Sequence, residues 1–263
     1  VKSMKILFDN AAKRATITSD NELTNYPASN LVSQFLEERW QENFSDPPVA
    51  VITVIFDDPE DIDSLFFSYT NATSITAVTN TGAVATGSTD TIEATTSGAA
   101  IDTDDDAFIS VLKAKKITGA IYWDGIQEGV TDVTITLYAD ANPIYLGGIG
   151  LGLSYKMPDP VGAIPESFED NSPSSGSVYG QSLQTLIAPM RTESYSFSGI
   201  KRDVVKEIWA QYLTVGLGGK VWLDVTEKNH DFKSPMYCKI EAVPATTKDG
   251  KYYNFTMSFT EAR

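Results

Sequence analysis

The sequence contains one cysteine, Cys238, and one histidine, His230, in 263 residues. A single cysteine excludes a disulfide within the chain, and these two residues leave too few ligands for a zinc site of the Cys/His type. Cys238 lies in an alternating strand pattern, where a buried thiol is expected, and His230 lies in a polar turn without a partner motif. We therefore expect no enzyme activity and assign no catalytic, cofactor-binding or metal-binding residue.

Positive charge is also scarce, because 20 Lys and Arg residues face 35 Asp and Glu residues, for a net charge of -15. This charge repels nucleic-acid phosphates and anionic lipid surfaces, so we expect no nucleic-acid partner. No apolar run approaches the roughly 20 residues of a membrane-spanning helix. The segment from Val1 to Asp9 lacks the long apolar region of a signal peptide, so neither membrane insertion nor export by the usual route is expected.

Short apolar runs rich in Val, Ile, Thr, Tyr and Phe dominate the chain and predict a mainly β protein. They follow one another without intervening helices, which favours an antiparallel β-sandwich or jelly roll over a parallel sheet. Turns are expected at Asn80-Thr81-Gly82 and at Asp124-Gly125. The clearest strand candidates are Met4 to Phe8, Val49 to Phe56, Ser64 to Tyr69, Ser74 to Thr79, Phe108 to Lys113, Ala120 to Trp123, Asp132 to Tyr138 and Ile144 to Leu151.

Composition divides the chain into three parts. The segment from Asn80 to Asp106 is rich in Thr, Gly, Ala, Ser and Asp, and we interpret it as a strand-bearing excursion at the surface of the sandwich. Pro, Ser and Gly accumulate between Met157 and Gly180, which indicates an extended linker or arm. The predicted organisation is a β-sandwich over residues 1–157, an arm over 158–190 and a small α+β unit over 191–263.

The last part has a β-α-β-β-β pattern. Ser194 to Phe197 alternates as a strand, and Asp203 then opens a run with apolar residues at helical spacing that ends near Gly216. Asp203 is the expected N-cap of this helix. Asp249-Gly250 predicts a hairpin turn between the last strands. The expected strands after the helix are Lys220 to Val225, Met236 to Val243 and Lys251 to Phe259.

Two acidic groups invite a metal or catalytic interpretation. The first comprises Asp102, Asp104, Asp105 and Asp106, but an EF-hand loop starting there would need Gly at Ala107 and Glu at Lys113. A solvated turn and a loosely bound surface cation both remain open for it. The second group follows a strand, includes Pro59 and is expected to form a polar bend; its members are Asp57, Asp58, Glu60, Asp61 and Asp63. A glycosidase needs only two carboxylates, and no particular pair is marked out here.

Glycines and aromatic residues have structural interpretations as well. The run from Gly147 to Gly152 lacks the Lys and Ser/Thr of a phosphate-binding loop, and we interpret it as a strand closely approached by another backbone. A sugar-stacking platform and core packing are the alternatives for the large aromatic residues, and core packing is favoured because Trp209 and Trp222 lie in apolar patterns. The aromatic residues concerned are Trp40, Tyr122, Trp123, Trp209 and Trp222.

The N-terminal part resembles discoidin-like or galactose-binding-like jelly rolls of phage virion proteins. The resemblance lies in Tyr26 to Leu31, Arg39-Trp40, the strand Ala50 to Phe56, Asp61 to Phe66 and the closing stretch Ile144 to Gly152. It covers roughly residues 1 to 157 and implies that the tryptophan fills the core. The sugar-contacting loops of the lectins have no counterpart, so the resemblance does not imply sugar binding.

The C-terminal part resembles tail-tip and distal-tail-like phage proteins, because the order strand, helix, Gly-rich turn, strand and final Glu-Ala-Arg is kept as a whole. The residues concerned are Ser194 to Gly199, Asp203 to Leu213, Gly218 to Asp224, Pro235 to Tyr237 and Phe255 to Arg263. This resemblance implies a structural protein of the virion tail or baseplate, assembled in the host cytoplasm. The implied partners are other tail proteins and further copies in a symmetric homo-oligomer. A carbohydrate-binding module for host-surface glycans, and hence for host attachment, is the alternative.

Overall fold

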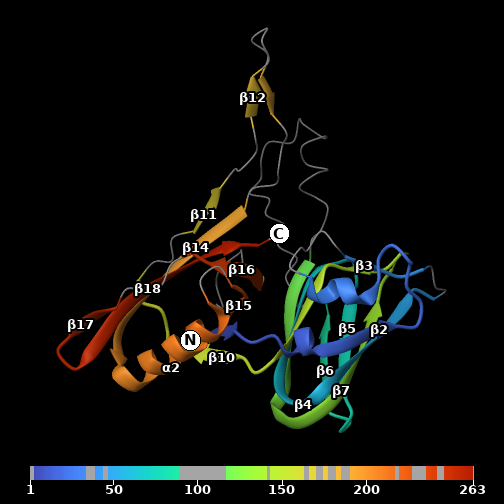
Figure 1. Ribbon diagram of the computed structural model, residues 1–263, viewed down its shortest axis with the longest axis horizontal. Helices are drawn as coiled ribbons and strands as arrows, with labels where there is room; N and C mark the ends of the chain where they lie inside the picture. Colours follow the sequence, from blue (N-terminus) through green and yellow to red (C-terminus); the bar gives the residue numbers. More distant parts are fainter. Residues whose placement is uncertain are drawn as a thin grey trace. The chain divides into compact units, whose positions relative to one another are not determined.

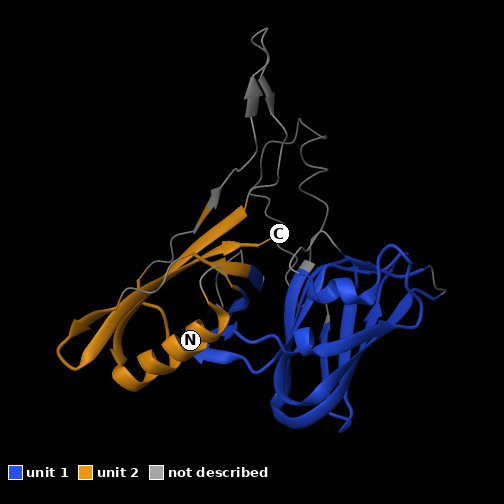
Figure 2. Ribbon diagram, viewed as in Figure 1, with its two compact units in different colours: residues 1–157, 220–237, 263 blue, residues 158–219, 238–262 orange. Residues whose placement is uncertain are grey.

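A computed structural model of the chain shows two compact units (Figures 1 and 2). The first comprises residues 1–157, 220–237 and 263, and the second comprises residues 158–219 and 238–262. The structure describes residues 3–33, 39–43, 47–88, 117–140, 143–162, 166–169, 174–176, 182–184, 190–216, 219–226, 235–241 and 246–262.

The predicted fold class is confirmed, because the described residues form antiparallel sheets and a single α-helix. The expected strand Phe108 to Lys113 lies outside the described residues. The turn at Asn80 to Gly82 is confirmed: Gly82 has a φ of 83°, the left-handed conformation that glycine adopts without steric cost.

Two long strands organise the first unit, β4 (Val49–Thr70) and β7 (Ile117–Tyr138), each of 22 residues. A straight strand of that length would extend roughly 70 Å. Val49 at the start of β4 nevertheless pairs with Tyr138, and so does Ser74, only four residues after the end of β4. Val49 and Ser74 thus lie on either side of Tyr138, two strand spacings or about 10 Å apart. The β4–β7 pair is therefore folded over on itself, which creates the two layers of a sandwich.

The remaining strands extend these layers. In the first layer, the order is β2 (Ala15–Ser19), β4, β7, β5 (Ser74–Thr79) and β6 (Val84–Ser88). In the second layer, β9 (Gly148–Gly152) pairs with the later half of β4. Two short strands, β3 (Trp40–Gln41) and β8 (Tyr145–Leu146), pair at one rim. Two 3₁₀ helices complete the sandwich, η1 (Ala11–Arg14) and η2 (Ala28–Val32).

The sandwich core follows the two-residue period of its strands. One face of β4, β5 and β7 is buried, and Trp40 is fully buried among these side chains, as the resemblance implied. The inward-facing residues of the first layer are Ile52, Val54, Ile75, Ala77, Val133, Ile135 and Leu137.

The fold-over is made by bulges and not by loops. Pairing of β4 with β7 shifts register between Ile55 and Ser64, where Pro59 offers no N–H to the ladder. On the opposing strand, Gly125 and Gly129 have φ values of 82° and 62°. The prediction of separate strands on either side of this segment, joined on β7 by a turn at Asp124-Gly125, was wrong, because bulges bend a strand while its pairing continues.

The sandwich is an insertion between two paired strands. β1 (Ser3–Leu7) enters the unit, and β10 (Tyr155–Met157) returns beside it, with Met4 opposite Met157. β15 (Lys220–Thr226) pairs along the other side of β1, with Trp222 opposite Leu7. Residues 8–154 therefore leave this small sheet and come back to it.

The second unit is built on β14 (Met190–Lys201) and β18 (Tyr252–Glu261), which pair along most of their length. β11 (Glu166–Glu169) pairs with β14, and β17 (Thr247–Asp249) pairs with β18 through the predicted turn at Gly250. β16 (Met236–Ile240) crosses the division of the chain, and its residues from Cys238 onward pair with β18.

The one described α-helix, α2 (Arg202–Val215), packs on β14 and β18 (Figure 1). Its buried stripe is Val205, Ile208 and Tyr212, and Gly216 ends it at a φ of 78°, as predicted. The predicted N-cap, Asp203, was wrong: β14 continues in extended conformation to Lys201, which occupies the cap position and makes no side-chain cap hydrogen bond. Asp203 instead lies in the first turn, where its charge complements the helix dipole.

The division of the chain into units has two features that bear on the predicted boundaries. Pro158 begins the second unit, at the position where the arm was expected to begin. Residues 220–237, expected in the C-terminal unit, group with the first unit because β15 pairs with β1. Within the expected arm, β12 (Ser174–Gly176) and β13 (Ser182–Gln184) pair with each other in a two-stranded sheet.

The close approach at Gly150 generates the first prediction. A Cβ at Gly150 would lie 2.6 Å from Cδ1 of Trp222 and 3.0 Å from Cδ2 of Leu7. We expect Gly150→Ala to lower the free energy of unfolding by about 1 to 3 kcal/mol through overpacking, as measured by urea denaturation. In a second background, Trp222→Phe replaces the indole by a smaller ring. There, Gly150→Ala should lower the free energy of unfolding by less than it does in the wild type. If Gly150→Ala lowers the free energy of unfolding equally in both backgrounds, Gly150 does not pack against Trp222.

Candidate functional site

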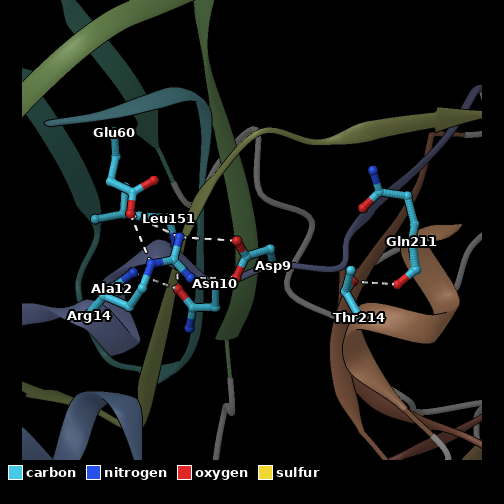
Figure 3. A network of polar contacts seen from close by, with 8 residues as sticks. All are labelled: Asp9, Asn10, Ala12, Arg14, Glu60, Leu151, Gln211 and Thr214. Carbon is cyan, nitrogen blue, oxygen red and sulfur yellow. Dashed lines mark hydrogen bonds and ion pairs between the residues drawn. The ribbon is translucent and has the colours of Figure 1, made fainter. Parts of the chain in front are cut away.

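Three members of the acidic group at the β4 bend, Glu60, Asp61 and Asp63, bond to other parts of the sandwich. Arg14 in η1 donates two hydrogen bonds to Asp9, at 2.7 and 3.0 Å, and one from Nε to Glu60 at 2.9 Å (Figure 3). Asp61 accepts from the Gly129 N–H at 2.8 Å, across the bend. These carboxylates therefore pair with groups of their own chain, as expected for a polar bend.

Asp63, the last member of the acidic group, and Asn10 both anchor the chain near β9. Asp63 accepts from Ser154 N–H at 2.7 Å and from its hydroxyl at 2.8 Å. The Oδ1 of Asn10 accepts from the N–H groups of Ala12 and Leu151, at 3.1 and 3.0 Å (Figure 3). The prediction for the glycine run is confirmed, since it forms β9 and a Cβ at Gly152 would lie 2.8 Å from the backbone oxygen of Asp9.

A partly buried polar contact of the first unit joins Tyr122 of β7 to Asp224 of β15. The Tyr122 hydroxyl donates to Asp224 at 2.5 Å, and Nζ of Lys5 lies 3.5 Å from the centre of the tyrosine ring. Burial, together with the charge of Asp224, raises the pKa of Tyr122. Neighbouring Trp222 packs on Phe66 at 5.9 Å between ring centres. This cluster holds β1 and β15 against the second layer of the sandwich.

The tryptophans are packing residues with one exception. Trp40, Trp123 and Trp222 are each at most 5 % exposed, so they present no ring to solvent for sugar stacking. Trp209 is only partly buried and packs edge-on to Tyr212, so the prediction that it belongs to the core stripe was wrong. The stripe passes through Ile208 instead, one residue earlier on the helix.

A second buried polar cluster lies in the second unit. Arg191 forms an ion pair with Glu193 at 2.9 Å, and the Tyr195 hydroxyl donates a short hydrogen bond to the same carboxylate. Burial raises the pKa of Tyr195, and the charge of Glu193 adds to the rise. Cys238 is fully buried on β16, as expected, and burial raises the pKa of its thiol. A buried thiol held in its protonated form is a poor nucleophile.

The outer face of the β14–β18 pair is lined by hydroxyl groups that bond to one another. Ser194 and Ser258 are 2.8 Å apart, and Ser196 and Thr256 are 3.1 Å apart. Each pair lies directly opposite on the two strands, which explains the contact. The hydroxyl groups of this face therefore bond across the two strands of the sheet.

Elsewhere in the unit, the Thr214 hydroxyl donates to the Gln211 oxygen near the end of α2 (Figure 3).

The sequence predicted no metal ligands, and two of the sites that it raised for consideration lie in parts of the chain that the structure does not describe. Asp102 to Asp106 and His230 lie outside the described residues. Within the described residues, His, Cys, Asp and Glu side chains form no group of three or more that could hold a metal ion. A search of the same residues for a helix of sufficient length and apolarity to cross a bilayer also found none.

A comparison with protein-family models and with curated protein sequences found no match for this chain.

Cys238 provides a direct test of the buried cluster in the second unit. We expect the native protein to resist labelling by a thiol reagent at pH 8, because the thiol is buried and its pKa is raised. In denaturant, one equivalent should react at once, since Cys238 is the single cysteine. Labelling of the native protein at the rate of the unfolded chain would show that the thiol is accessible.

The raised pKa values of the partly buried Tyr122 and the buried Tyr195 predict a loss of stability at alkaline pH. A raised pKa keeps Tyr122 and Tyr195 protonated in the folded protein, whereas both ionise in the unfolded chain above about pH 10. The free energy of unfolding should therefore be unaffected by these groups below pH 10. Above it, the loss should be about 1.4 kcal/mol per pH unit for each tyrosine. Urea denaturation at pH 8, 10 and 11 measures this, and Tyr195→Phe should flatten the dependence; a stability independent of pH up to 11 would refute it.

Proposed function

We propose that this chain is a non-enzymatic structural component of a bacteriophage virion, located in the tail tip or baseplate. It acts through protein–protein assembly, in a symmetric homo-oligomer and with neighbouring tail proteins. The resemblance of both parts of the sequence to phage virion and tail proteins motivates the proposal. The observation that carries the assembly role is the hairpin of β12 and β13.

This hairpin pairs with itself alone within the described part of the chain. β12 reads Ser-Ser-Gly and β13 reads Ser-Leu-Gln, so the pair has little apolar surface to bury. An isolated two-stranded hairpin is marginally stable in water. Ordering its backbone costs about 1 to 2 kcal/mol per residue, whereas burial contributes only about 25 cal/mol per Å² of apolar surface. Contact with a second protein surface supplies the missing burial.

The chemistry of the described residues supports a structural role over catalysis. Glu60 bonds to Arg14, Asp61 and Asp63 accept from backbone N–H groups, and Glu193 is occupied by Arg191 and Tyr195. A general acid or nucleophile must instead reach a substrate. Glycan recognition gains no support either, because the sandwich tryptophans are buried.

The hairpin can be tested without removing the arm. Residues 172–186 are replaced by a Gly/Ser segment of equal length, which keeps the tether and removes the strand pairing. Both units should keep their circular dichroism and thermal transition, while light scattering should show a monomer in place of the wild-type oligomer. A matched control with Leu213→Ser, on the exposed face of α2, should assemble normally. An unchanged oligomer in the Gly/Ser variant would refute the role of the hairpin.

Absence of catalysis is a separate prediction. A clean preparation should not turn over polysaccharide or peptidoglycan above a buffer blank. Turnover abolished by a single substitution, such as Glu60→Gln, would contradict the structural role.

A further inference from the structure

Two glutamates face each other at the rim of the sandwich where β3 lies. Glu22 and Glu42 form an isolated antiparallel bridge. The hydrogen bonds on either side of them run from Leu23 N–H to the Gln41 oxygen and from Asn43 N–H to the Asn21 oxygen, both at 3.0 Å. This arrangement makes Glu22 and Glu42 a non-hydrogen-bonded pair, in which the Cα atoms are about 4.5 Å apart and the side chains share one face.

The Glu42 carboxylate is buried, and no hydrogen bond or ion pair to another described residue offsets the loss of its hydration. The residue is 1 % exposed, and neither of its carboxylate oxygens has a hydrogen-bond partner among the described residues. On Glu22, one oxygen accepts from Ala28 N–H at 2.7 Å. The nearby Arg39 lies over the rings of Tyr26 and Tyr145, at 5.7 and 5.0 Å. Among the described residues, no Lys or Arg forms an ion pair with either glutamate.

Glu22 is exposed and Glu42 is buried, so the pair presents one solvated and one desolvated carboxylate, and a cation between them would compensate both charges. A buried carboxylate is strongly disfavoured unless it is paired, coordinated or protonated. A second carboxylate directly opposite adds to this cost, because like charges on facing strand positions repel. The backbone nevertheless fixes both positions: Glu42 N–H donates to the Ile144 oxygen at 2.9 Å, and Glu22 holds the first residue of η2.

We propose that Glu22 and Glu42 bind a divalent cation, and that this cation is Ca²⁺. Two carboxylates balance its charge, and hard oxygen ligands favour Ca²⁺ or Mg²⁺ over transition metals. Mg²⁺ demands a near-ideal octahedron, which two carboxylates fixed by strand pairing do not readily provide, whereas the roughly six to eight oxygens around Ca²⁺ can include backbone oxygens and waters on the exposed side of Glu22. Ca²⁺ accepts carboxylates in one- or two-oxygen contacts and in flexible geometry. The bound ion ties the segment from Asn21 to Ala28 to β3 and so closes this rim of the sandwich.

The test uses the full chain, freed of metal with a chelating resin and titrated with CaCl₂ in a calorimeter. We expect one Ca²⁺ per chain and a rise of about 5 °C in the melting temperature at saturating Ca²⁺. Glu42→Gln should weaken binding at least 100-fold and Glu22→Gln at least 10-fold. The matched control is Glu128→Gln, an exposed glutamate at the bend, which should bind Ca²⁺ like the wild type. Wild-type protein that neither binds Ca²⁺ nor gains stability would overturn the proposal.

Terbium luminescence locates the ion even if Glu42→Gln folds poorly. Trp40 precedes Glu42 by two residues on the same side of the strand, about 7 Å away along the chain. Excitation of the tryptophans should therefore sensitise emission from bound Tb³⁺, and added Ca²⁺ should quench it by competition. Trp40→Phe should reduce the emission more than Trp209→Phe does. Emission that persists unchanged in Glu22→Gln would place the ion elsewhere and refute the site.

Discussion

The fold-over of the β4–β7 pair is the constraint on which the first unit depends. Strands of 22 residues cannot fit a small sandwich unless they reverse, and the reversal brings Val49 and Ser74 to opposite sides of Tyr138. Bulges make the bend possible without breaking the pairing, and the Arg14 ion pairs with Asp9 and Glu60 hold its outer side. Once the two layers face each other, the alternating apolar residues of both are enclosed together around Trp40.

Within the same unit, the strands before and after the sandwich pack on its outer surface. β1 and β10 bracket the sandwich, and β15 adds Trp222 beside Leu7. The indole packs on Phe66 and against the bare backbone of Gly150, so the outer face of β9 and β4 is also covered. Tyr122 and Asp224 provide the polar link of this contact. Glycine at position 150 is thus a packing requirement, not part of a ligand-binding loop.

Local patterns predicted some elements well. Ser74 to Thr79 and the helix ending at Gly216 carry their period and end signals in adjacent residues. The continuity of β4 was not predictable in this way, because acidic residues and Pro59 have the composition of a turn, and a bulge has no separate signature. Pairing of β1 with β15 joins segments more than 200 residues apart, and β2 is a short run that was not predicted.

Local sequence patterns also failed to predict the buried polar residues whose partners are distant in the chain. Glu42 lies in a polar stretch after Arg39-Trp40 and has the sequence surroundings of an ordinary surface glutamate, whereas its bridge to Glu22 and its backbone N–H bond to the Ile144 oxygen join segments distant in the chain. The pairing of Tyr195 with Glu193 could have been suspected from their spacing of two on one strand, which places both on one face. The Asp102 to Asp106 group lies outside the described residues, so both of its interpretations stay predictions.

Among the described residues, the β12–β13 hairpin pairs only with itself, and on this we base the proposal that the chain works as an assembled subunit. Sedimentation velocity of the full chain from about 1 to 100 μM tests this most directly, because assembly follows mass action. The account predicts a discrete oligomer of fixed stoichiometry that grows at the expense of monomer as concentration rises. A single monomeric species at every concentration would contradict it.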